Sequence, residues 1–227
     1  MIDFAKLVVT GADARNFLHG QLTADMDHLD YLYEHAEHSG LAGLCNIKGR
    51  LEAVFWVRRV QENYFDLYLP QCISEAIATL LRRYLFRSKV VIEVVDVDHV
   101  EAVEHIPQDF NIPWVVEATQ GKYVPQMVSL DVLKGVHPRK GCYIGQEIVT
   151  RLRDLGKNKK RLGRISLGNN INVNISDTIY AHNEVAGEIV SVHENEALAV
   201  LVLSELNQPL KLSDNIDILK VWKDDNE

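Results

Sequence analysis

Cys142 lies in the run Lys-Gly-Cys-Tyr-Ile-Gly-Gln-Glu, residues 140–147, and is the first candidate for chemistry in this chain. The segment Lys134 to Arg164 holds ten Lys or Arg against two acidic residues, a net of +8 in a chain whose net charge is −8. The thiolate is the form of cysteine that acts as a nucleophile or metal ligand, and nearby cations favour it over the thiol. The neighbouring Arg139 and Lys140 therefore favour a reactive sulfur.

A helix is expected directly after this run. The apolar residues Ile148, Leu152 and Leu155 have helical spacing, so residues 145–147 would form the first turn. The N-terminal end of a helix carries partial positive charge, which suits an anion or a reactive sulfur. Alternatively, Cys142 is a small buried hydrophobic residue, because free cysteines are among the most buried residue types. The residues alone leave both interpretations open.

Length and composition predict a globular protein of one large or two modest domains, since 47% of its 227 residues are apolar and 25% are charged. The chain lacks a long apolar stretch, and its first residues do not resemble a signal peptide. We therefore expect a cytoplasmic protein without a membrane partner.

Cysteine and histidine spacing gives no sign of a disulfide framework or a metal site. Cys45, Cys72 and Cys142 are odd in number and widely spaced, which fits a reducing compartment. His35 and His38 form the one close histidine pair at a helical spacing. Because no third ligand is nearby, we interpret the pair as surface residues and expect no bound metal.

The elements that must position Cys142 alternate between strands and helices up to residue 161, an α+β pattern. Strands are predicted over residues 5–10, 41–45, 51–60, 64–69 and 90–95, from β-branched runs and turn residues. Helices are predicted after Asp13, a candidate N-cap, and from Ile73 to Leu85. Gly49 lies in the polar link between residues 45 and 51 and indicates a hairpin.

From Leu162 onward the pattern changes to short strands separated by Asn, Gly, Asp and Ser. The strands are predicted near residue 165 and over 178–181, 188–192 and 198–203, and together they indicate a small β-barrel or sandwich. We therefore place a domain boundary close to residue 162, so that residues 1–161 form an α+β domain and residues 162–227 a C-terminal β-domain.

Four segments in order resemble the YgfZ/GcvT-like family, the folate-binding relatives of the glycine-cleavage aminomethyltransferase. They are Gly11-Ala12-Asp13 with the run from Phe17 to Asp25, Cys45 to Arg50, Tyr123 to Met127, and Lys140 to Glu147. The last is the most specific and is the family signature. The resemblance implies a GcvT-like folate-binding fold: a ring-like α+β body around a central channel that holds tetrahydrofolate, followed by a C-terminal β-barrel. The tract of about residues 71–111 is too short for a full second lobe, so either that lobe is reduced or the channel is more open.

The resemblance also implies a function: a tetrahydrofolate-binding accessory protein for the assembly or maintenance of iron-sulfur enzymes, including those that methylthiolate tRNA. Folate and iron-sulfur client enzymes would be its partners, with tRNA served indirectly. Cys142 would be the essential thiol, acting as a nucleophile, a transient cluster ligand or a redox-sensitive group. The implied folate contacts are Phe4, Gln126, Lys140, Tyr143, Gln146, Glu147 and Arg151. Trp114 is a further aromatic candidate.

Two other functions are weighed against this one. A folate-dependent aminomethyl transferase would need an aspartate shortly after the Lys48-Gly49-Arg50 segment, where this chain has Leu51-Glu52-Ala53-Val54 instead.

A direct tRNA-binding factor would use the Arg151 to Arg164 stretch for phosphate contacts. The net charge of −8 and the lack of interleaved aromatic residues weigh against direct binding. Whether the chain is an enzyme is left open, with an accessory role preferred to aminomethyl transfer.

Overall fold

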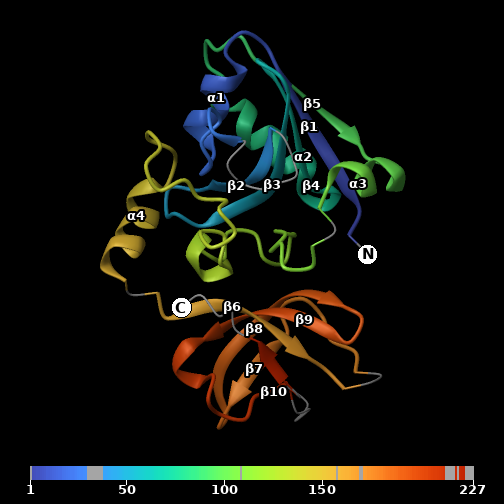
Figure 1. Cartoon of the computed structure of the whole chain (residues 1–227), viewed down its shortest axis with the longest axis vertical. Coiled ribbons are helices and arrows are strands. Elements are labelled where there is room, and N and C mark those ends of the chain that lie inside the picture. Colours follow the sequence, from blue (N-terminus) through green and yellow to red (C-terminus); the bar gives the residue numbers. More distant parts are fainter. Residues whose placement is uncertain are drawn as a thin grey trace.

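The computed structural model describes residues 2–29, 38–107, 109–156, 158–168, 171–212, 218 and 220–222. Its N-terminal part is a five-stranded antiparallel sheet with strand order β2-β3-β4-β1-β5 (Figure 1). The strands are β1 (Phe4–Thr10), β2 (Ser39–Cys45), β3 (Leu51–Gln61), β4 (Tyr64–Pro70) and β5 (Val91–Asp96). The helices of this part are α1 (Ala14–Gln21), α2 (Gln71–Arg82) and α3 (His99–His105).

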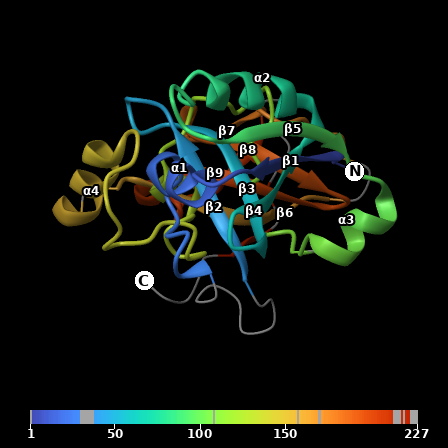
Figure 2. The same cartoon turned by 90° about the horizontal axis from the view of Figure 1, so that it is seen from above.

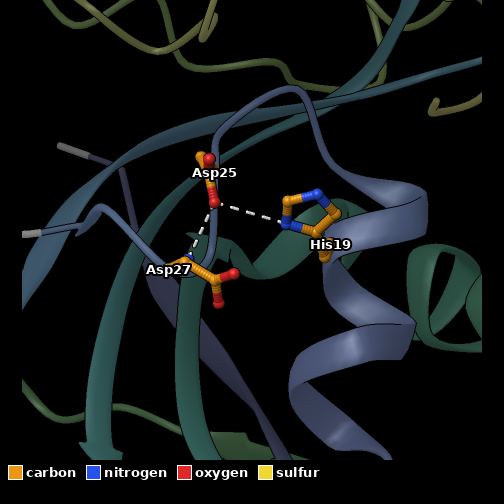
Figure 3. Close-up of side chains that lie close together, drawn as sticks. All are labelled: His19, Asp25 and Asp27. Carbon is orange, nitrogen blue, oxygen red and sulfur yellow. Dashed lines mark hydrogen bonds and ion pairs between the residues drawn. The ribbon is translucent and has the colours of Figure 1, made fainter. Parts of the chain in front are cut away.

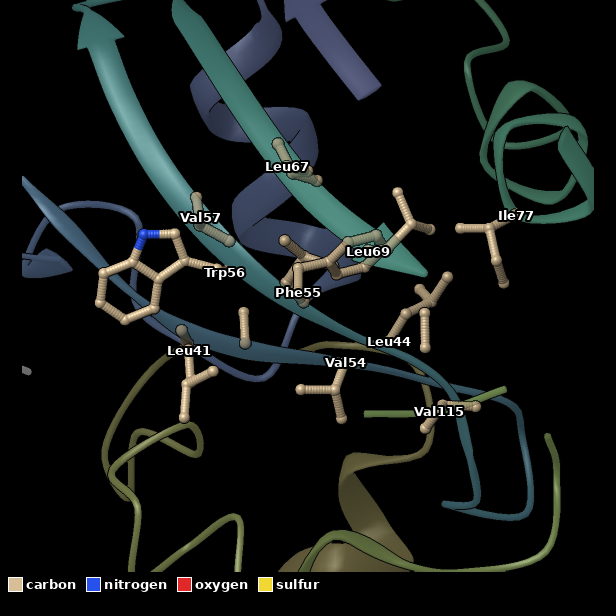
Figure 4. Close-up of a cluster of buried hydrophobic side chains, with 14 of the residues drawn as sticks. Leu41, Leu44, Val54, Phe55, Trp56, Val57, Leu67, Leu69, Ile77 and Val115 are labelled. Carbon is tan, nitrogen blue, oxygen red and sulfur yellow. The ribbon is translucent and has the colours of Figure 1, made fainter. Parts of the chain in front are cut away.

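Helix α2 covers one face of this sheet, as the view from above shows (Figure 2). Its buried residues Ile73, Ile77 and Leu81 recur at helical spacing and meet the sheet on one side. Ile77 packs close to Leu69 of β4 in the buried cluster drawn in Figure 4. Each such side chain removed from water contributes about 1.5–3 kcal/mol, so this apolar stripe is what holds α2 in place.

The opposite face of β2 and β3 is covered by a segment with little regular structure, from Ile106 to Gly135, which includes the short 3-10 helix η2 (Pro125–Val128). Val115 of this segment belongs to the same buried cluster as Leu41 and Val54 (Figure 4). The approach is close: a Cβ on Gly43 of β2 would lie 3.0 Å from the Leu130 side chain. Both faces of β2 and β3 are therefore buried, which explains their almost continuous apolar sequences.

After α4 (Gln146–Leu155) the chain enters a second antiparallel sheet, drawn in orange and red in Figure 1. Its strand order is β10-β7-β8-β9-β6-β11. The strands are β6 (Lys160–Ser166), β7 (Thr178–Ala181), β8 (Glu184–His193), β9 (Glu196–Val202), β10 (Lys211–Leu212) and β11 (Lys220–Trp222), with the 3-10 helix η3 (Leu203–Glu205) after β9. Alternate residues of β9 serve two cores: Ala199 and Leu201 face the sheet's own core, whereas Leu198 and Val200 join the N-terminal core.

The predicted strands of both sheets and the helices after Asp13 and Pro70 are confirmed, and the predicted Gly49 hairpin joins β2 to β3. Two local details differ from the prediction. Asp13 is the N-cap residue of α1, but its carboxylate makes no capping hydrogen bond and instead accepts one from the Lys89 N–H at 2.7 Å. Helix α2 ends at Arg82, short of Leu85.

The larger architecture is confirmed in part. Across the described residues the second sheet is open, with β10 and β11 as its two outer strands. A closed barrel and a central channel therefore stay predictions. The tract 71–111 forms α2, β5 and α3, and β5 extends the first sheet. None of the described helices is both long and apolar enough to cross a bilayer.

Candidate functional site around Cys142

Cys142 is exposed in an irregular segment that leads into α4. The interpretation of this cysteine as a buried hydrophobic residue is therefore wrong. All three cysteines are free, and the other two have different surroundings. Cys45 is buried, and burial, assisted by Glu52, raises the pKa of its thiol to about 12, so it stays protonated. Cys72 is exposed on α2. Cys142 is thus the exposed thiol of the basic stretch, and it lies just before α4.

The segment that carries Cys142 is anchored by the buried side chain of Lys140. Its ammonium donates hydrogen bonds to the backbone carbonyls of His19, Leu22 and Ala24, the last at 3.1 Å. The same Nζ lies 5.1 Å from the centre of the Tyr143 ring. Burial lowers the pKa of Lys140 to about 8, and the nearby Asp25 opposes this shift. Because an ammonium has three donors, these carbonyls use its full capacity, and it holds the segment in place.

A second anchor is a close crossing of two backbones. Gly145, the residue before α4, has φ +80°, and a Cβ there would lie 2.4 Å from the Asn46 carbonyl oxygen and 2.8 Å from the Gly49 Cα. Glycine is the residue that tolerates both the positive φ and the missing space. The β2–β3 hairpin loop therefore packs directly against the turn that follows Cys142. Two motifs about 95 residues apart meet here.

The remaining predicted folate contacts fall into two groups. Tyr143 is buried, Gln146 donates to the Lys140 carbonyl at 3.5 Å, and Glu147 and Arg151 are exposed on α4. Gln126 is buried against α4 and donates to the Val149 carbonyl at 2.7 Å.

Phe4 lies apart from that group, on β1. It packs edge-on against Trp114, with ring centroids 5.0 Å apart. The structure thus gathers the signature residues and Gln126 around α4, while Phe4 belongs to the surroundings of Trp114.

A small pocket lies where the irregular segment meets the second sheet. Trp114, Thr119 and Tyr123 line it together with Val190 of β8 and four further apolar residues, Leu51, Pro113, Val115 and Val128. The Tyr123 hydroxyl faces Glu188, which pairs with Lys122 at 2.5 Å. Burial and the Glu188 carboxylate raise the pKa of this hydroxyl. The cavity has a volume of about 10 Å³, which leaves room for roughly one water molecule.

Three polar side chains that the spacing did not single out as a group come together after α1. Figure 3 shows His19 and Asp25 facing one another, with His19 Nδ1 and Asp25 Oδ1 3.3 Å apart, and Asp27 donating its N–H to Asp25 at 2.9 Å. Their side-chain ligand atoms lie within 4.8 Å of one another. The donor types suit a transition metal. However, Arg15 already pairs with Asp27, and the Lys140 ammonium lies near Asp25, so the charge is balanced and we assign no metal. The His35 and His38 pair lies partly outside the described residues.

No family model matches the chain. The tRNA-modifying protein YgfZ of Klebsiella pneumoniae is 24% identical over 233 aligned positions, which cover 72% of this chain and 69% of that one. The protein of the same name from Vibrio atlanticus is 22% identical over 285 positions, covering 95% and 85%. The crystal structure of the glycine cleavage system aminomethyltransferase T from Bartonella henselae superposes with a TM-score of 0.69 at 10% identity, over 95% of this chain and 81% of that chain. The chain fits a YgfZ/GcvT-like family.

The alignments also show a difference in length between this chain and its relatives. The Vibrio alignment spans 285 positions, more than the 227 residues of this chain, so the relative contains residues that this chain lacks.

Glu52 lies in the stretch after Arg50 that lacks the aspartate expected of an aminomethyl transferase. The Glu52 carboxylate is bound by the Asn46 side-chain amide at 2.7 Å, at the base of the β2–β3 hairpin. It supports the hairpin loop that packs against Gly145. This arrangement gives Glu52 a structural partner.

The sequence did not predict the surroundings of His19, Asp25 and Glu188. The Phe17 to Asp25 motif contained the first two, but 122 residues separate His19 from Gly141, and nothing in that spacing predicts their contact. Glu188 of β8 faces Tyr123 of the irregular segment, and no local sequence signal links these two residues.

Proposed function

We propose that this chain is a tetrahydrofolate-binding accessory protein for the assembly or maintenance of iron-sulfur enzymes, including those that methylthiolate tRNA, and that it acts in the cytoplasm through Cys142. The observation that carries the proposal is the exposed Cys142 on a segment anchored by Lys140 and Gly145. A thiol that is accessible and held in one place suits transfer or transient ligation, whereas a buried thiol such as Cys45 is inert. Two relatives that bear the name tRNA-modifying protein support the tRNA part of the proposal.

The folate part depends on whether the residues present fit the ligand. Gln126 is 3% exposed, and its Oε1 has no hydrogen-bond partner among the described residues, so it is free to accept from a pterin N–H. Trp114 and Tyr123 offer aromatic surface in the pocket beside the second sheet, a pocket that Gln126 does not line. The residue types therefore suit tetrahydrofolate, but the pocket has room for only about one water. Binding of tetrahydrofolate there requires residues 113–123 to move away from β8. Saturable quenching of Trp114 fluorescence by tetrahydrofolate is the measurement for this part.

Bound tetrahydrofolate would supply a one-carbon carrier or an accessory ligand. The chain's own residues would hold it: Gln126 at the pterin edge and Arg151, an exposed cation of α4, at the glutamyl carboxylate. Lys140 has no donor left for that carboxylate, because its three hydrogen bonds go to backbone carbonyls. It serves the site by holding Cys142.

The test is rescue of tRNA methylthiolation in a bacterial strain that lacks its own family member. The native chain is expected to restore the modification, and Cys142→Ser is expected to abolish rescue while remaining expressed and folded. Cys72→Ser is the matched control, because Cys72 is also exposed but lies on α2. Equal rescue by both variants would make Cys142 structural and remove the thiol from the proposal.

Direct tRNA binding is the second candidate. In the structure, the basic stretch is divided: Arg161 pairs with Asp131 at 2.8 Å, Arg164 pairs with Glu196, and Arg153 donates to the Pro138 carbonyl. Phosphate contacts would fall mainly to exposed cations such as Arg139, Arg151 and Lys159. So few cations give weak and strongly salt-dependent binding. The structure therefore favours an indirect relation to tRNA.

A further inference from the structure

The link between α2 and β5 differs in charge from the rest of this acidic chain. Residues 82–89 read Arg-Arg-Tyr-Leu-Phe-Arg-Ser-Lys, with four cations and no acid, whereas the whole chain has a net charge of −8. Tyr84 and Phe86 lie between Arg83 and Arg87. In Figure 1 the link lies at the end of the first sheet that points away from the second sheet. Residues 82–89 therefore form a basic and aromatic surface.

The Phe86 ring projects into solvent. Its residue is 98% exposed, the highest value among the large apolar residues that the structure describes, and Tyr84 is 42% exposed. A ring in water gains nothing from the hydrophobic effect, so packing within the chain does not explain it. The backbone of Phe86 has φ +44°, a left-handed conformation that is rare for a bulky residue. Strain of this kind is typical of functional sites.

The link is held in place at its base. The Ser88 N–H donates to the Leu85 carbonyl at 2.6 Å and closes a turn that contains Phe86. The Lys89 N–H donates to the Asp13 carboxylate at 2.7 Å. The Lys89 carbonyl oxygen lies 2.1 Å from the position that a Cβ on Gly11 would occupy. A turn fixed in this way presents its ring to a ligand at a small cost in conformational entropy.

Three of the four cations are available to a ligand. Arg83, Arg87 and Lys89 are exposed, and their side chains make no hydrogen bond or ion pair within the described part of the chain. Arg82 differs, because its guanidinium donates to the Ile92 carbonyl at 2.8 Å. Positive charge without an acidic partner attracts anions such as phosphate groups.

We propose that residues 82–89 bind a single-stranded nucleic acid, with a base stacked on the Phe86 ring and phosphates held by the three exposed cations. Proteins that bind single strands without sequence preference combine cations along the strand with aromatic rings on which bases stack. The link has both, whereas the stretch from Arg151 to Arg164 has no aromatic residue. A direct contact with RNA would thus be made at the link. The inference goes beyond the proposed function and does not rest on it.

An anionic membrane is the other partner that cations and an exposed ring suit. Membrane binding increases with the apolar area that is inserted. The apolar side of α2, with Ile73, Ile77 and Leu81, is already buried on the sheet, which leaves Phe86 and the partly exposed Tyr84. Stacking needs only the face of one ring for each base. The observations therefore favour a nucleic acid.

The test is the binding of a fluorescein-labelled oligouridylate of about 12 nucleotides to the full chain, followed by fluorescence anisotropy. Three phosphate contacts predict that log K falls with log[salt] with a slope of about −2 for a single strand. An oligothymidylate of the same length is expected to bind similarly, because base stacking and phosphate contacts do not use the 2′-OH. No binding at about 50 mM salt would overturn the proposal.

Phe86→Leu separates stacking from general hydrophobic contact. Leucine stays apolar but has no flat face, so binding is expected to weaken about tenfold, in the low part of the range for one stacked base, with the salt slope unchanged. Phe86→Trp is expected to bind at least as tightly as the native chain. Because Phe86 is 98% exposed, neither change removes a packing contact.

Leu155→Ala is the control for the ring, because it removes an exposed apolar side chain from the basic stretch. Its affinity is expected to stay within about twofold of the native value, since leucine supplies no face for stacking. Native affinity in Phe86→Leu would show that no base stacks on the ring and would overturn the proposal.

Arg87→Gln tests the phosphate contacts. Loss of one of three contacts is expected to make the salt slope shallower by about 0.7. Lys159→Gln removes the same charge from an exposed position of the basic stretch and is expected to keep the native slope. Equal changes in both variants would mean that only net charge matters, which contradicts a site at the link.

Ultraviolet crosslinking of the native chain to the oligouridylate needs no variant. Mass spectrometry is expected to find the crosslinks at Tyr84 or Phe86, and crosslinks confined to residues 139–164 would refute the inference. Vesicles of phosphatidylcholine with phosphatidylserine are the competing ligand. Sedimentation with these vesicles in the absence of oligouridylate binding would make the partner a membrane. None of these measurements uses Cys142 or folate, so the rescue result is judged separately.

Discussion

The segment around Cys142 and helix α3 are held to the same sheet body by opposite means. The Cys142 segment has no regular secondary structure, yet it is anchored by a buried ammonium on three carbonyls and by a glycine packed against another backbone. Helix α3 is regular, yet none of its residues is buried. Glu101 holds it to Lys6 at 2.6 Å and to Tyr68 at 3.3 Å, and His105 lies 3.2 Å from Arg58.

The comparison teaches that regular structure and firm attachment are separate properties. Partly exposed ion pairs such as that of Lys6 contribute about 0–1 kcal/mol, whereas buried polar groups that lose their partners cost about 1–3 kcal/mol each. Beneath α3, Asp66 is 4% exposed, and its Oδ1 has no hydrogen-bond partner among the described residues. Every Nζ donor of Lys140 is used, so the Lys140 side chain is better satisfied than that of Asp66.

The largest effect is expected from Gly145→Ala, which attacks the closest contact of the Cys142 segment. The left-handed backbone costs an alanine about 1–2 kcal/mol, and overpacking adds about 1–3 kcal/mol. The clash is with backbone atoms of Asn46 and Gly49, 2.4 Å and 2.8 Å from the new Cβ, so no side-chain rotation relieves it. We expect the free energy of unfolding, measured in urea, to fall by about 3 kcal/mol.

Gly20→Ala provides the control for Gly145→Ala. Gly20 lies in α1, and a Cβ there would meet nothing within 4 Å. Alanine in a helix is preferred over glycine by about 0.5–1 kcal/mol, so this variant is expected to be slightly more stable. Similar stability of the two variants would mean that the backbone crossing at Gly145 is not tight.

Lys140→Met is expected to have the second largest effect. It keeps most of the side-chain volume but leaves the carbonyls of His19, Leu22 and Ala24 without their donor. Two or three buried acceptors without partners predict a loss of about 3 kcal/mol in the free energy of unfolding. Lys159→Met, at an exposed position, is expected to stay within about 0.5 kcal/mol of the native chain. If Lys140→Met were as stable as the native chain, desolvation of the ammonium would outweigh its hydrogen bonds.

The difference between the two regions also explains what the sequence could predict. The strands of both sheets followed from β-branched runs, and α4 followed from the spacing of Ile148, Leu152 and Leu155, because these signals are local. The anchoring of Lys140 could not be predicted in this way. A lysine in a basic stretch is normally solvated, and only the tertiary structure brings residues 19–24 to it. The open edges of the second sheet likewise depend on pairing between distant strands.

The smallest effect is expected beneath α3, where Asp66→Asn tests the less satisfied region. Burial is the largest cause that raises the pKa of Asp66, with Lys6 and Arg58 opposing it. A folded-state pKa above the unfolded value means that the folded chain binds the extra proton, so the contribution of Asp66 to stability increases as pH falls through the folded pKa. At pH 7 the charged Asp66 opposes folding, and Asp66→Asn is expected to be as stable as the native chain or up to about 1 kcal/mol more stable. Urea unfolding at several values between pH 7 and pH 4 should show this advantage shrinking, because the protonated Asp66 comes to resemble asparagine.

Glu62→Gln, on the exposed β3–β4 turn, is the control for Asp66→Asn, and its free energy of unfolding is expected to stay within about 0.5 kcal/mol of the native value throughout. An advantage that grew toward acid would show that Lys6 and Arg58 outweigh burial, and α3 would then cover a region as well satisfied as the Cys142 segment.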